Sequence, residues 1–60
     1  MKFEVGNFII SKNNSRMALI VSVEHPMLIL MWVDTGRQLQ FSIDSAKHFI
    51  HQNKWEYVEI

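Results

Sequence analysis

The feature that most limits the fold is a seven-residue apolar run, MLILMWV, at residues 27–33. Turn-forming residues enclose it, because EHP precedes the run and DTGR follows it. A run of this length is typical of a buried β-strand and is far shorter than the roughly 20 apolar residues of a membrane-spanning helix. We therefore expect a β-sheet with this segment as a central strand, and no association with a membrane.

Further short segments of β type accompany this strand. They lie at residues 5–11, 17–23, 38–42 and 54–60, with polar loops or turns at 11–16, 24–27 and 34–37. Residues 44–53 favour a helix, because Ala46, Phe49 and Ile50 fall on one side and Ser42 or Asp44 can cap its first turn. The sequence predicts a mainly β single domain, residues 1–60, of five strands with one short helix before the last strand.

The central strands have a predicted register. Placing Val33 opposite Gln38 makes apolar side chains of the two strands face one another, and placing Val23 opposite Leu28 does the same for the preceding strand. The side chains that then share one face, the predicted inner face, are Leu19, Val21, Val23, Leu28, Leu30, Trp32, Leu39 and Phe41.

The opposite, outer face is predicted to be apolar as well. It presents Ile20, Ile29, Met31 and Val33 on the two inner strands, where an antiparallel sheet usually shows polar groups to water. One explanation is that the helix or the last strand folds over this patch. The other is that the patch binds a protein partner or a second copy, since a contiguous exposed apolar patch marks an interface.

The charge balance argues against a protein built to bind phosphates. Six Lys and Arg balance six Asp and Glu, so the net charge is zero with neutral histidines. Nucleic-acid binding remains the alternative function, and its candidate contacts are Lys12, Asn14 and Arg16 in the loop at 11–16 and Arg37 in the following hairpin.

Signals for chemistry are sparse. The chain has no cysteine, so it has neither a disulfide nor a thiolate metal site, and its three histidines, His25, His48 and His51, do not supply a zinc ligand set. No serine lies in a nucleophile-elbow pattern. We expect no metal, no cofactor and no catalysis. Tyr57 with Asp34 is a candidate for part of an aromatic cage that binds a methylated cation.

The order of the segments resembles a small SH3-like barrel of the Tudor or KOW type. The matching features are FEVGNFI at residues 3–9, two long central strands, WVDTG at residues 32–36 and a helical piece before the final strand. Short barrels of this kind are common in bacteriophages and bacteria. The resemblance therefore implies a five-stranded barrel and a non-catalytic interaction module, such as a phage structural, accessory or host-interaction protein, located in the cytoplasm or in a virion.

Overall fold

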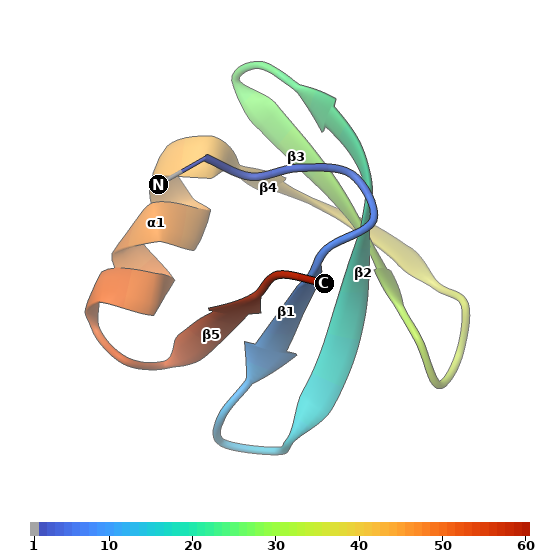
Figure 1. Cartoon of the computed structure of the whole chain (residues 1–60), viewed down its shortest axis with the longest axis vertical. Helices are drawn as coiled ribbons and strands as arrows, with labels where there is room; N and C mark the ends of the chain where they lie inside the picture. The colour runs from blue at the N-terminus through green and yellow to red at the C-terminus, as the bar shows by residue number, and fades with distance from the viewer. Residues whose placement is uncertain (1) are drawn as a thin grey trace.

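The computed structural model describes residues 2–60 and contains one antiparallel sheet and one helix (Figure 1). The strands are β1 (Phe8–Ser11), β2 (Arg16–Glu24), β3 (Met27–Trp32), β4 (Gln38–Ser42) and β5 (Trp55–Val58), and the helix α1 (Ile43–His51) connects β4 to β5. The sheet order is β4-β3-β2-β1-β5. The predicted mainly β fold with one helix before the last strand is confirmed.

The sheet is curved and has two edges. β4 forms one edge and β5 the other, and no strand pairing within residues 2–60 joins them. The described chain is therefore an open, curved sheet of five strands, with α1 and the segment at residues 2–7 on its concave side (Figure 1).

The predicted pairing of β3 with β4 has the correct parity but is displaced by two residues. Met31 pairs with Gln38 and Leu30 with Leu39, where the sequence had suggested Val33 opposite Gln38. A displacement of two residues leaves every side chain on its original face, because side chains alternate with a period of two.

The connection between β3 and β4 explains this displacement. It forms a closed loop at residues 33–37, in which Trp32 N donates to Arg37 O at 2.9 Å and Gly36 N donates to Trp32 O at 2.8 Å. Gly36 has a φ of +75°, a conformation that glycine adopts without steric cost. The loop is thus longer than a two-residue turn, and β4 begins to pair further back along β3.

The pairing of β2 with β3 contains a β-bulge that the sequence did not predict. Val23 pairs with Leu28 as expected, but the register changes between Ser22 and Ile20, so that Ile20 pairs with Leu30. Val21 is the extra residue on β2. Because one extra residue reverses the alternation, every β2 residue before it changes face.

The bulge corrects the predicted core. Ile20, which had been assigned to the outer face, is buried with an exposed fraction of 0%, and Ala18, two residues before it on the same face, is buried with an exposed fraction of 1%. Leu19 and Val21, which had been assigned to the inner face, are only partly buried and do not belong to the core cluster. The other six predicted inner-face residues are in the core or packed against it: Val23, Leu28, Leu30, Trp32, Leu39 and Phe41.

The helix covers the concave side of the sheet. Ser42 is its N-cap, with Ser42 Oγ accepting a hydrogen bond from Ser45 N at 3.0 Å, which confirms one of the two predicted caps. Ile43 and Ala46 are buried in the core cluster and Ile50 packs against it. This burial, rather than helix propensity alone, holds a helix of nine residues in place.

The segment at residues 2–7 closes the remaining part of the concave side. Phe3 is buried and meets Tyr57 edge to face, with 5.3 Å between ring centroids. The Tyr57 hydroxyl accepts hydrogen bonds from Glu4 N at 3.1 Å and Asn7 Nδ2 at 2.7 Å. The outer face of the sheet is therefore the only broad face that no described segment of residues 2–60 covers.

Candidate functional site

The outer face carries a continuous group of apolar side chains. Strand pairing places Val58, Phe8, Leu19 and Met31 side by side in one row that crosses β5, β1, β2 and β3. Their neighbours along the strands, such as Ile9 and Leu30, are buried in the core, so this row points to the opposite side.

A second row lies next to the first. Ile10 pairs with Met17, and Val33 N donates to Met17 O at 3.0 Å, which extends the row toward the β3–β4 loop. Met17 and Val33 are 39% and 53% exposed. Ile29, between the buried Leu28 and Leu30, adds a further apolar side chain on the other side of the first row.

We call these eight side chains the outer patch: Phe8, Ile10, Met17, Leu19, Ile29, Met31, Val33 and Val58. Three of the four residues predicted for this surface, Ile29, Met31 and Val33, belong to it. The fourth prediction was wrong, because the bulge at Val21 directs the side chain of Ile20 into the core.

The structure tests the first explanation of the patch, which is cover by the helix or the last strand. The helix α1 packs its apolar side on the core, through Ile43, Ala46 and Ile50, and so lies on the opposite side of the sheet. The last strand, β5, extends the sheet beside β1 and does not fold over it. Within residues 2–60, internal cover of the outer patch is therefore excluded.

Sequence reasoning missed five members of the patch. Phe8 and Ile10 alternate with Ile9 in β1, and this alternation is visible in the sequence. Which of the two sets faces the core is fixed only by the pairing of β1 with β2. Leu19 was assigned to the wrong face because of the bulge, and Met17 and Val58 follow from the same pairings.

The basic residues proposed for nucleic-acid binding lie at one end of the sheet. Lys12 and Asn14 are exposed in the β1–β2 loop at residues 12–15, and Arg37 is exposed in the β3–β4 loop. Arg16, predicted to lie in the solvated loop, is instead the first residue of β2 and is only partly exposed.

Arg16 is held by two neighbours. Its guanidinium carbon lies 4.0 Å from the centroid of the Trp32 ring, and its Nη2 is 3.0 Å from Asp34 Oδ1. The hydrogen bond from Arg16, together with its charge, holds the pKa of the Asp34 carboxyl below its ordinary value. The stacked and paired guanidinium is therefore a fixed cation rather than a freely moving one.

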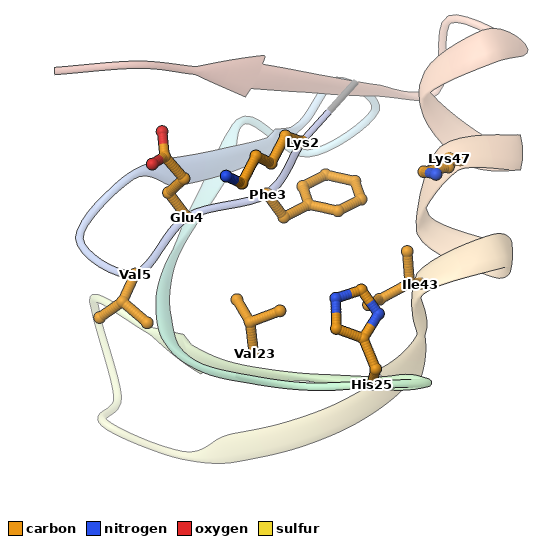
Figure 2. A pocket seen from close by; sticks show the side chains of 8 residues that line it. All are labelled: Lys2, Phe3, Glu4, Val5, Val23, His25, Ile43 and Lys47. Atoms are coloured by element: carbon orange, nitrogen blue, oxygen red, sulfur yellow. The ribbon is translucent and has the colours of Figure 1, made fainter.

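A hollow of about 480 Å³ opens at the opposite end of the sheet (Figure 2). Figure 2 shows Phe3, Val23 and Ile43 at its apolar floor, with the His25 ring beside Ile43 and Lys47 on the helix above. Lys2 and Glu4 stand at its rim. The hollow thus combines an apolar floor with groups of both charge signs, which defines no particular ligand.

The structure reports on two other sequence candidates. His48 and His51 lie in the last turn of α1, and no cluster of three metal-ligating His, Cys, Asp or Glu side chains occurs within residues 2–60. Tyr57 is engaged with the segment at residues 2–7 whereas Asp34 is engaged with Arg16, so the two do not form a cage.

In the described part of the chain no helix has the length and apolar character to cross a membrane.

Comparisons of the chain with family models, with curated proteins and with solved structures find no match. These comparisons therefore add no support to the resemblance to SH3-like barrels.

Proposed function

We propose that the protein is a non-catalytic interaction module that self-associates through the outer patch. The observation that supports this is the continuity of the patch across β5, β1, β2 and β3, without any described segment over it. Full burial of one large aliphatic or aromatic side chain is worth roughly 1.5–3 kcal/mol. Eight such side chains left partly in water are a substantial driving force for association with another protein surface.

The lack of charge in the patch favours a second copy as the occupant. Glu56 on β5 flanks it on one side, and Gln38 and Gln40 on β4 flank it on the other. Recognition of a partner by charge would require charged side chains in the patch, whereas an uncharged apolar surface is complementary to a second copy of itself. Two copies related by a two-fold axis would bury the same patch on both chains.

The size of the patch predicts a weak dimer. Four strands spaced about 4.8 Å apart and three rows about 6.7 Å apart cover on the order of 300 Å² in projection. A standard protein interface buries about 800 Å² on each partner. We therefore expect a dissociation constant in the micromolar range or weaker, so that dimer and monomer exchange at laboratory concentrations.

The proposal also includes a finer fold assignment, an SH3-like barrel. The strand order, with β5 beside β1 and a helix between β4 and β5, supports this assignment, as do the sequence features that resemble such barrels. An accessory or structural role in a bacteriophage rests on the same resemblance.

The test is sedimentation of the wild type and of two charge-matched variants over about 10 µM to about 1 mM. Met31→Lys adds a charge within the patch, on β3, and Gln40→Lys adds the same charge on the flanking strand β4. We expect the wild type and Gln40→Lys to associate as concentration rises, and Met31→Lys to stay folded and monomeric. A wild type that is monomeric throughout contradicts self-association. Unfolding of Met31→Lys contradicts the assignment of Met31 to the surface.

A further inference from the structure

The charged side chains divide unequally between the two ends of the sheet. β1 and β3 stop, and β2, β4 and β5 start, at the end that bears the loops at residues 12–15, 33–37 and 52–54 (Figure 1). Four of the six Lys and Arg residues lie there, and Asp34 is the single carboxylate in those three loops. We call this end, with Lys12, Arg16, Arg37 and Lys54, the basic end.

The neutral total charge therefore hides a polarised molecule. Outside the basic end, only Lys2 and Lys47 stand against five carboxylates, at Glu4, Glu24, Asp44, Glu56 and Glu59. A local excess of one sign raises the concentration of ligands of the other sign, whatever the net charge of the chain. The basic end is thus suited to an anion.

One hollow at the basic end combines cations with aromatic rings. It has a volume of about 490 Å³ and lies where β1 meets β5 and the end of α1. Lys12 and Lys54 line it from two loops, and Trp55 and Phe49 form its aromatic wall, with ring centroids 4.8 Å apart. Asn13 and Asn53 also line it; their Oδ1 atoms accept hydrogen bonds from Ser11 Oγ and Lys12 Nζ, which leaves their amide NH2 groups as donors toward a ligand.

A second hollow, of about 430 Å³, repeats this combination on the other side of β2. Arg16 and Arg37 supply its cations and Trp32 its aromatic ring, and Gln38 and Thr35 supply polar groups. The guanidinium plane over Trp32 is itself a surface on which a base can stack.

The two hollows lie on neighbouring strands at the same end of the sheet. Ser11, which lines the first hollow, pairs directly with Arg16, which lines the second. Trp55 on β5 and Trp32 on β3 are separated by β1 and β2, which places them three strand spacings, or about 14 Å, apart along the sheet.

We propose that the basic end binds single-stranded nucleic acid, with one base in each hollow and phosphates at Lys12, Lys54 and Arg37. Cations alone would suit any polyanion, but aromatic walls and amide groups beside them suit unpaired bases, which stack and offer hydrogen-bonding edges. A spacing of about 14 Å is several times the 3.4 Å per nucleotide of a duplex strand. Bases in the two hollows are therefore not stacked on each other, which a single strand permits and a duplex does not.

The two tryptophans make this testable without a label, because both lie at the basic end and they are the only ones in the chain. Titration with oligothymidylate at low salt should quench their fluorescence. Neutralising about three phosphates gives a slope of about −2 for the logarithm of affinity against that of salt concentration, so doubling the salt should weaken binding about four-fold.

Two double variants separate a local site from a general effect of charge. Lys12→Ala with Lys54→Ala removes two charges at the basic end, and Lys2→Ala with Lys47→Ala removes two elsewhere; all four residues are exposed. We expect the first variant to bind about ten-fold more weakly than the second, since lost phosphate contacts lower affinity directly. Circular dichroism confirms folding, and Arg37→Ala provides an independent loss of affinity if the first variant is unstable.

Three results would overturn the proposal. The first is the absence of quenching with the wild type at low salt. The second is an equal loss of affinity in the two double variants, because the oligonucleotide would then respond to net charge alone. The third is binding to heparin as tight as that to the oligonucleotide together with no change in tryptophan fluorescence, which would indicate a general polyanion surface without base stacking.

Discussion

Ile20 and Leu19 provide the sharpest test of the β2–β3 bulge. Truncating either residue to alanine removes three carbon atoms, so the two variants are chemically matched. The bulge buries Ile20 completely, beside Leu30, and turns Leu19 toward the outer patch. Without the bulge, the two residues would exchange roles.

The expected cost follows from burial. Truncation of a fully buried isoleucine to alanine destabilises a protein by about 2–5 kcal/mol, because transfer energy is lost and a cavity remains. A domain of this size has a total stability of about 3–9 kcal/mol. Ile20→Ala should therefore remove much of the free energy of unfolding, whereas Leu19→Ala should cost about 1 kcal/mol or less, since Leu19 stays partly in water.

The measurement is urea unfolding followed by tryptophan fluorescence. If Ile20→Ala is too unstable to measure, Ile20→Val supplies a graded value of about 0.5–1.5 kcal/mol, which lowers Tm by several degrees in a domain of this length. The bulge is refuted if Leu19→Ala loses as much stability as Ile20→Ala.

Two further changes test the β3–β4 loop. Gly36 has a φ of +75°, and an added Cβ would meet no atom within 4 Å. Gly36→Ala should therefore lower the free energy of unfolding by about 1 kcal/mol from backbone strain alone, and Gly36→Asn should lower it by less. Equal melting curves for the wild type and these two variants would exclude the left-handed conformation at Gly36. Arg16 lowers the pKa of Asp34 in the folded state, so in acid the folded protein binds fewer protons than the unfolded chain. The contribution of this pair to the free energy of unfolding is therefore complete at neutral pH and is lost as the pH falls through the lowered pKa. Asp34→Asn should therefore flatten the dependence of Tm on pH below about pH 4, and an unchanged profile would contradict a stabilising pair.

Local sequence patterns predicted the elements well, because each depends on neighbouring residues. The apolar run at 27–33 with its flanking turns indicated β3, and Ser42 with the spacing of Ala46, Phe49 and Ile50 indicated α1. The β3–β4 register was wrong by two residues, yet Leu39 and Phe41 were correctly assigned to the core, because an even displacement preserves the face.

The features that escaped prediction depend on contacts between distant parts of the chain. Nothing in MALIVSV distinguishes a regular strand from one with a bulge at Val21, because both faces of β2 are apolar. The basic end was only partly visible, since Lys54 joins Lys12 only when β5 pairs with β1. Trp32 was assigned to the inner face, but the position of Trp32 and Trp55 at the walls of two hollows follows from the sheet order.

The pairing of β1 with β5 has a consequence for how the chain acquires its structure. Phe8 pairs with Val58 and Ser11 with Trp55, so one side of β1 stays without hydrogen-bonding partners until β5, the last strand along the chain, arrives. Contacts between such distant residues form late, because closing a long loop costs chain entropy before strand pairing provides any compensating stabilisation. During synthesis β1 is therefore an exposed edge, apolar on both faces, of the kind that pairs with other chains. Pairing with Trp55–Val58 closes this edge.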